Sequence, residues 1–222
     1  MWYRMAADQG DASAQYSLGY MYANGQGAPH DDAEVVKGYR MAADQGHASA
    51  QNNLGVMYYG GRGVPQDYVE ATKWYRKAAD QGHAPAQFNL GIMYDRGLGA
   101  PQDSSEAVKW FRKAADQGYA EAQNNLGAMH EYGRGAIKNF VLAHMWYHLA
   151  SAAQDAEDET KKRAANNRDR VERKMIPQNI AHAQSLAAEW QSKSHVPSVT
   201  EGGGRTGFHP GTISRGLAWP PP

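Results

Sequence analysis

The sequence has no cysteine, no net charge and no long hydrophobic run. Without cysteine, disulfide bonds, cysteine-bound zinc and a cysteine nucleophile are excluded. The 23 basic and 23 acidic residues balance, so the chain lacks the basic field with which nucleic-acid-binding proteins meet phosphates. No apolar stretch approaches the roughly 20 residues of a membrane span, and residues 1–10 lack the charged and apolar regions of a secretory signal. The mean hydropathy of −0.73 is low for a packed domain.

What the chain does contain is a sequence repeat. The tetrapeptide Ala-Asp-Gln-Gly begins at residues 7, 43, 79 and 115, so the period is 36 residues. A Leu-Gly pair, a methionine and a Gly-x-Gly step recur in the same phase, and most copies carry a Trp-Tyr or Trp-Phe pair. A repeat of this length predicts stacked structural units rather than one globular core. The departures are Gly38 in place of tryptophan in the second copy and, in the fourth copy, His130, Ile137 and Leu142.

Each repeat predicts two helices. In the second copy the first helix is predicted over residues 48–59, because Leu54 and Met57 fall on one helical face with other repeated apolar residues. Gly55 follows Leu54, and its missing Cβ is expected to let another helix approach closely. A Gly-x-Gly step that begins at Gly61 then ends the helix, because glycine adopts the left-handed conformation without steric cost.

The second helix of each repeat is predicted to begin at an aspartate. Asp67 precedes Glu70 by three residues, the spacing of a capping box in which each side chain binds a free backbone N–H at the start of the helix. Trp74 and Tyr75 share the buried face of this helix, and Gly82 ends it. The short connection to the next repeat requires neighbouring helices to be antiparallel. A stack of such pairs buries a narrow core and keeps a large polar surface, which explains the low hydropathy.

The repeated residues resemble Sel1-like repeats, which are relatives of tetratricopeptide repeats with a slightly longer unit. The matching pattern is A-x-A-Q-x-x-L-G-x-M-Y-x-x-G-x-G-x-P-x-D followed by A-x-x-W-Y-x-x-A-A-x-Q-G, and it covers residues 2–153. The resemblance implies an all-α fold, a right-handed α-solenoid of antiparallel helix pairs. It also implies a non-enzymatic adaptor that holds a protein or peptide partner, since no catalytic residue is common to the family.

The chain divides into three predicted segments. Residues 1–153 form the repeat array; because Trp2 matches the middle of a second helix, we expect that the first helix pair is truncated and that a longer array precedes it. Residues 154–193 predict two helices that cap the last repeat. The basic run at 168–174 is interpreted as a solvated helix face, not a nucleic-acid patch, because acidic residues are interleaved with it. Residues 194–222, rich in glycine and proline, predict a disordered tail.

Three histidines offer the alternative of a metal-dependent enzyme. His144 and His148 are four residues apart on one predicted helix, the spacing of two metal ligands, and His130 is a candidate third ligand. No glutamate signature accompanies them, so we favour ordinary surface or interface histidines. The Gly-x-Gly steps lack the preceding strand and the lysine of a phosphate-binding loop. The sequence therefore favours a chain without a metal, a cofactor or a catalytic residue.

Positions that vary between copies identify candidate partner-binding residues. Positions fixed in every copy hold the scaffold, whereas variable positions on the same helix are free to recognise a partner. By analogy with tetratricopeptide arrays, the first helices line a concave face, and an aromatic and aliphatic centre with a polar rim is typical of a protein-binding patch. The predicted contact residues on this face are Asn52, Val56, Tyr59, Phe88, Ile92, Asp95, Asn124 and Glu131.

Besides the metal-dependent enzyme, the sequence supports two hypotheses for the function. The first, which the repeats favour, is an interaction scaffold with a protein or peptide partner. The second is a structural or regulatory component of a bacterial envelope or secretion assembly. The sequence predicts no nucleic-acid partner and no transmembrane segment, leaves the oligomeric state open, and fits either the bacterial cytoplasm or the periplasm.

Overall fold

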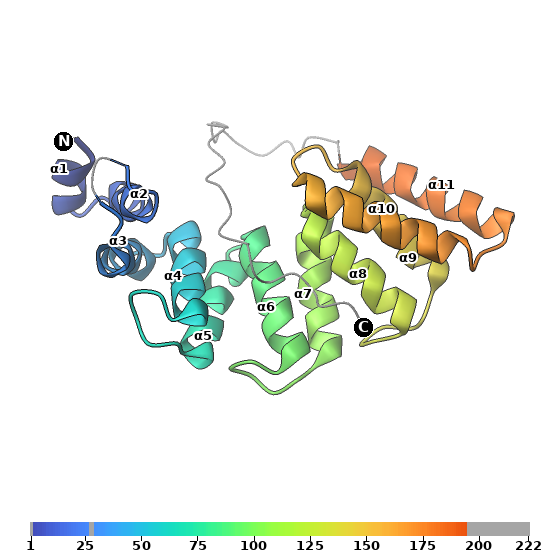
Figure 1. The fold of residues 1–222 in the computed structure, drawn as a ribbon, viewed down its shortest axis with the longest axis horizontal. Helices are drawn as coiled ribbons and strands as arrows, with labels where there is room; N and C mark the ends of the chain where they lie inside the picture. Colours follow the sequence, from blue (N-terminus) through green and yellow to red (C-terminus); the bar gives the residue numbers. More distant parts are fainter. Residues whose placement is uncertain (1, 27–28, 195–222) are drawn as a thin grey trace. The chain divides into compact units, whose positions relative to one another are not determined.

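Helices account for the regular structure of the part of the chain that the structure describes. The computed structural model describes residues 2–26 and 29–194 (Figure 1), so the tail expected at 194–222 lies outside it from residue 195 onward. Within these ranges, no helix is both long and apolar enough to cross a membrane. In chain order the helices are α1 (Trp2–Asp8), α2 (Ala12–Ala23), α3 (Asp32–Asp44), α4 (Ala48–Gly60), α5 (Tyr68–Asp80), α6 (Ala84–Arg96), α7 (Ser104–Asp116), α8 (Ala120–Tyr132), α9 (Phe140–Ala152), α10 (Asp158–Glu172) and α11 (Pro177–Ser194).

The helices pack as successive antiparallel pairs, which confirms the predicted all-α solenoid class. Within a repeat the two helices contact each other, as α2 does with α3, α4 with α5 and α8 with α9. Consecutive repeats join where α3 contacts α4 and where α5 contacts α6. The helix predicted over 48–59 is α4, and Gly61 ends it in the left-handed conformation with φ of 66°.

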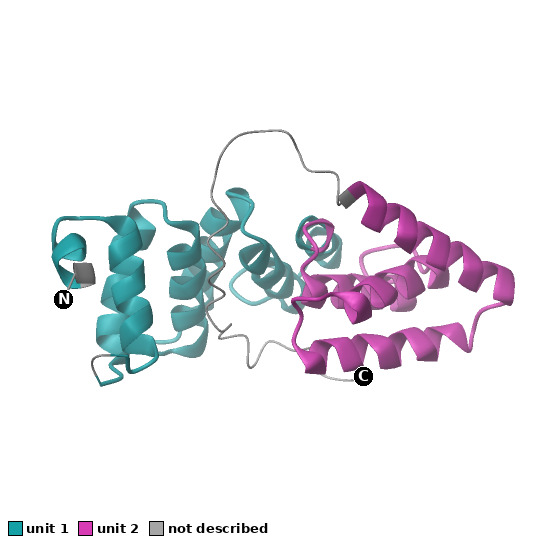
Figure 2. Cartoon of the chain, turned by 90° about the horizontal axis from the view of Figure 1, so that it is seen from above, with its two compact units in different colours: residues 1–114 teal, residues 115–222 magenta. Residues whose placement is uncertain are grey.

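The chain separates into two compact units, residues 1–114 and 115–222 (Figure 2). The first holds α1 to α6 and most of α7, and the second holds α8 to α11. In the second unit α10 and α11 both pack against α9, and α10 also contacts α8. The indole rings of Trp146 on α9 and Trp190 on α11 meet edge to face, 6.0 Å apart. The two helices that follow the repeats, α10 and α11, therefore pack on the last helix pair, α8 and α9.

The glycine of each Leu-Gly pair lies against an aromatic ring of the next helix. A Cβ on Gly55 would come within 2.7 Å of the Tyr75 ring, and one on Gly91 within 2.7 Å of the Phe111 ring. Real Cβ atoms do not approach other atoms so closely, so glycine is required at both sites. The repeated Leu-Gly and the second aromatic of the Trp-Tyr pair are thus two halves of one contact. The predicted close helix approach at Gly55 is confirmed.

The exceptional Gly38 makes a contact of a different kind in the first unit, between two helix backbones. A Cβ at Gly38 would lie 2.9 Å from the Cα of Gly19, so the backbones of α2 and α3 meet directly. The tryptophan found at this position in the other copies has no room here. The backbone of α2 therefore occupies the space that a side chain at this position would need.

Buried glutamines tie each repeat to its neighbours. Gln51 donates from its side chain to the carbonyl oxygen of Ala43, at 3.0 Å, and Gln87 donates to that of Ala79 at 3.2 Å. Gln81, from the Ala-Asp-Gln-Gly tetrapeptide, donates to the side-chain oxygen of Gln51 at 2.7 Å. These bonds satisfy polar groups inside the array, which explains why glutamine recurs at two positions of the repeat.

The predicted capping box is only half correct. The Asp67 carboxylate accepts from the backbone N–H groups of Val69 and Glu70, at 2.9 and 3.0 Å, so aspartate caps α5 as predicted. The reciprocal bond from glutamate is replaced, because the Asp67 N–H donates instead to the carbonyl oxygen of Tyr58. Glu70 pairs with Lys73 at 2.5 Å. Glu34 on α3 and Glu106 on α7 occupy the same position in their repeats, and each likewise pairs with the lysine three residues later.

Candidate partner-binding face

The predicted contact residues on α4 differ in how accessible they are. Val56 and Tyr59 are half-buried, and the Tyr59 ring lies 5.3 Å from the ring of Tyr68. Asn52 is buried; its side-chain oxygen accepts from the amide of Asn89 on α6, at 3.0 Å. Asn52 thus links two consecutive first helices, a role that the sequence pattern did not predict.

The three predicted contact residues on α6 are buried. Phe88 is 5% exposed and its ring lies 5.8 Å from that of Phe111, while Ile92 is fully buried. Asp95 is 2% exposed, and its carboxylate accepts from the Ser104 hydroxyl at 3.5 Å. In the first unit, Val56 and Tyr59 are therefore the most accessible of the six predicted residues. Their role in binding a partner stays a prediction.

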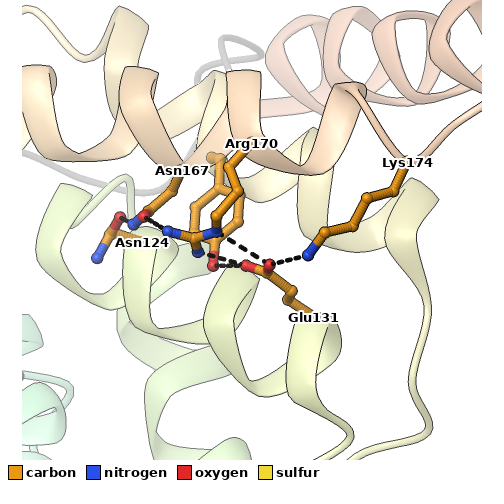
Figure 3. A network of polar contacts seen from close by, with 6 residues as sticks. Asn124, Glu131, Asn167, Arg170 and Lys174 are labelled. Carbon is orange, nitrogen blue, oxygen red and sulfur yellow. Dashed lines mark hydrogen bonds and ion pairs between the residues drawn. The ribbon is translucent and has the colours of Figure 1, made fainter. Parts of the chain in front are cut away.

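The two predicted contact residues of the second unit are both bound by α10 (Figure 3). The amide of Asn167 donates to the side-chain oxygen of Asn124 at 2.9 Å. The Arg170 guanidinium donates to both carboxylate oxygens of Glu131, at 3.1 and 2.6 Å, and the Lys174 ammonium donates to one of them at 3.1 Å. The variable positions of α8, the first helix of the last repeat, therefore bind a helix of the same chain, α10.

Glu131 is a buried anion with three donors. It is 1% exposed, and the Tyr147 hydroxyl on α9 adds a hydrogen bond of 2.9 Å to those from Arg170 and Lys174. Burial on its own raises the pKa of the Glu131 carboxyl, but the hydrogen bonds from Arg170, Tyr147 and Lys174 outweigh it and hold the pKa below its usual value. The bond to Glu131 in turn raises the pKa of Arg170. The carboxylate is therefore charged, and it attracts Arg170 on α10 and Lys174 on the turn that follows α10.

These contacts correct the interpretation of the basic run at 168–174. It was expected to form a solvated helix face, yet Arg170 and Lys174 reach a buried carboxylate. The sequence carried a signal for this pairing. Asn167 and Arg170 are three residues apart, so they share one face of α10, and Lys174 follows four residues later on the turn after the helix. Asn124 and Glu131 are seven residues, or two turns, apart on α8 and face the same way.

The three candidate metal ligands do not come together. His144 is buried and donates from Nε2 to the Glu172 carboxylate at 3.3 Å, while its ring stacks on His148 with 6.5 Å between centroids. His130 instead lies against the carbonyl oxygen of Ile137, 3.3 Å from its Nδ1. Among residues 2–26 and 29–194, no group of three or more histidine, aspartate or glutamate side chains is placed to hold a metal ion. The alternative of a metal-dependent enzyme thus finds no site in the described part of the chain.

Solved structures of bacterial repeat proteins resemble this chain. A protective antigen of uropathogenic Escherichia coli with an SLR (Sel1-like repeat) fold is 34% identical, with a TM-score of 0.79 over 87% of this chain and 40% of its own. A Sel1 repeat protein from Oxalobacter formigenes is 30% identical, with a TM-score of 0.71 over 90% of this chain and 77% of its own. The chain thus spans about 40% of the length of the E. coli protein. No curated protein matches it.

The repeat itself identifies the family. The family described as Sel1 repeat matches five consecutive segments of the chain, residues 1–11, 12–47, 48–83, 84–119 and 120–155. These segments follow the 36-residue period and the helix pairs of the structure. Because the matched segments make up well over half of the sequence, the chain belongs to the Sel1 repeat family.

Proposed function

We propose that this chain is a non-enzymatic scaffold that holds a protein partner, or a peptide segment of one, on the first helices of its repeats. Sel1 repeat proteins generally act as protein-interaction scaffolds. On the face formed by the first helices, the positions that vary from repeat to repeat select the partner.

The single observation that carries this proposal is the docking of α10 on α8. Two predicted contact residues, Asn124 and Glu131, bind a helix through its side chains. The equivalent positions in the first unit are 36 and 72 residues earlier. They hold Phe88 with Asp95 on α6, and Asn52 with Tyr59 on α4. The same face of the repeat, with different residues, can bind a different helix or extended segment.

Removing two aromatic rings from this face tests the proposal. In the full-length chain, Tyr59→Ala combined with Phe88→Ala removes both aromatic rings at the predicted positions, the half-buried Tyr59 and the buried Phe88. Capture of partner proteins from a lysate of the source organism, with the purified chain as bait, should fall about tenfold or more, as for hot-spot residues. Replacing Tyr59 by the photo-crosslinking residue p-benzoylphenylalanine should attach the same partner covalently.

Two controls make the result interpretable. The variant Met41→Ala with Val69→Ala removes exposed apolar side chains from the second helices α3 and α5, so its capture should equal that of the wild type. Circular dichroism establishes that each variant keeps its helices. If loss of the buried Phe88 ring unfolds the chain, capture is measured with the single variant Tyr59→Ala instead. Unchanged capture by a folded double variant would contradict the proposed face.

A further inference from the structure

Three exposed apolar side chains lie on or beside two turns of the second unit. Tyr132 is 45% exposed, Ile137 is 87% exposed and Ile176 is 58% exposed. Ile137 lies on the turn between α8 and α9, and Ile176 on the turn between α10 and α11. In the three earlier copies of the repeat the position of Ile137 is a proline. At 87% exposed, the Ile137 side chain packs against little of the fold.

The two turns meet around one aromatic ring. The ammonium of Lys138, from the first turn, lies 5.2 Å from the centre of the Phe140 ring, and that of Lys174, from the second, lies 5.6 Å from it. Met175 packs in the same apolar cluster as Phe140. Both turns lie at the same end of the second unit in Figure 1. The two turns that carry the exposed isoleucines are therefore neighbours, and residues 132–140 and 173–176 are here called the turn surface.

The turn surface is basic as well as apolar. Residues 133–139 contain Arg134 and Lys138, residues 173–176 contain Arg173 and Lys174, and neither segment contains an acidic residue. Lys174 shares the buried carboxylate of Glu131. In the described ranges, Lys138 and Arg173 are exposed and form no ion pair, so their charge is available to a partner.

We propose that the turn surface binds an anionic lipid bilayer. Exposed isoleucines on the two turns can enter the boundary between headgroups and acyl chains, while the adjacent lysine and arginine meet the lipid phosphates. Tyr132 and Phe140 supply aromatic rings of the kind that lie at headgroup depth. This binding attaches the second unit to a membrane surface without a spanning helix.

Vesicle sedimentation with the full-length chain tests this assignment. Vesicles of equal parts phosphatidylglycerol and phosphatidylcholine should bind the protein, vesicles of phosphatidylcholine alone should bind it far less, and added salt should weaken the binding. The variant Lys138→Gln with Arg173→Gln should lose about fivefold in partition coefficient for each charge removed. The variant Ile137→Ser with Ile176→Ser should also bind weakly, because insertion of both isoleucines is lost.

A matched variant on the other unit separates this surface from general stickiness. Val69→Ser with Lys73→Gln removes one exposed apolar side chain and one exposed lysine from α5 and should bind vesicles as the wild type does. Equal binding by the wild type, the turn variants and this control would overturn the proposal, as would no binding to phosphatidylglycerol. Binding of a synthetic acidic amphipathic peptide, measured with the same variants, tests the alternative that the turn surface binds a protein. If the turn variants weaken binding of that peptide but not of vesicles, the surface is for protein and the lipid assignment is wrong.

Discussion

Individual residues show why the repeat has the composition it has. Glycine occurs where a Cβ would meet the ring of the next helix, as at Gly55 against Tyr75. Glutamine occurs where a buried carbonyl oxygen needs a donor, as at Gln51. Aspartate occurs where free N–H groups begin a helix, as at Asp67. Each repeated residue therefore satisfies one local physical requirement, and the period repeats that requirement.

Two glycines on α4 allow a matched test of the close helix contact. Gly55→Ala places a methyl group 2.7 Å from the buried Tyr75 ring and should destabilise the chain by about 1–3 kcal/mol through overpacking. Gly60→Ala, on the same helix, meets only Arg62 at 3.6 Å and should be neutral or stabilise by about 0.5–1 kcal/mol, because alanine favours helix over glycine. Urea unfolding followed by circular dichroism measures both. Similar midpoints for the two variants would mean that Tyr75 moves aside at little cost.

A histidine that caps α6 predicts a pH dependence. The Nδ1 of His83 accepts from the Ala86 N–H at 3.3 Å, and its Nε2 lies 3.4 Å from the Ser49 hydroxyl, so the bond requires a neutral ring. Burial, with a smaller effect from the charge of His47, lowers the pKa of His83 from 6.5 to about 4. The unfolded chain therefore binds a proton at a higher pH than the folded chain. The stability supplied by the neutral ring is complete above pH 6.5 and declines as the pH falls from there toward 4.

Aspartate at this position should flatten that pH dependence. Asp11 occupies the equivalent position before α2 and caps it with a bond of 2.6 Å to Ala14, so His83→Asp keeps a cap that needs no neutral imidazole. Urea midpoints of the wild type and the variant, measured on both sides of pH 6, should diverge as the pH falls, the wild type losing more. His47 caps α4 in the same way and is present in both chains. Parallel pH profiles would show that protonation of His83 does not cost the cap.

At the scale of helices, α10 is attached to the last repeat by charge as much as by apolar contact. Its buried side chains are small, namely Thr160, Ala164 and Val171. Its polar face carries the bonds to Asn124 and Glu131. A helix with so little apolar area depends on those bonds for its position.

Removal of the Glu131 charge should therefore loosen α10. Glu131→Gln leaves Arg170 and Lys174 without their carboxylate and should reduce stability by about 1–3 kcal/mol, a range that allows for the partial exposure of both cations. Hydrogen exchange of the α10 amides should speed up more than that of the amides of α8 and α9. Glu189→Gln, which breaks an exposed pair with Lys193 on α11, is the control and should change little. Unaltered exchange in α10 would show that apolar contacts alone hold it.

At the scale of the whole chain, the period made most of the fold predictable. The order of helices, the start of α4, the aspartate caps and the glycine contact at Gly55 all follow from interactions between residues close in sequence or at a constant spacing. The reciprocal glutamate caps did not follow. At Glu70, a lysine three residues on competes for the carboxylate, and a carbonyl oxygen from the preceding helix binds the N–H that the cap would have used.

The sequence by itself determined the family, the helix pairs and the face whose residues vary between repeats. Tertiary structure alone decided what occupies that face. Glu131 binds residues 39 and 43 positions later, outside the repeated region, so no period relates them. The proximity of the two turns that carry Ile137 and Ile176 likewise depends on how the chain packs around Phe140. A repeat specifies its own local contacts, whereas contacts with a unique helix arise only when the chain folds.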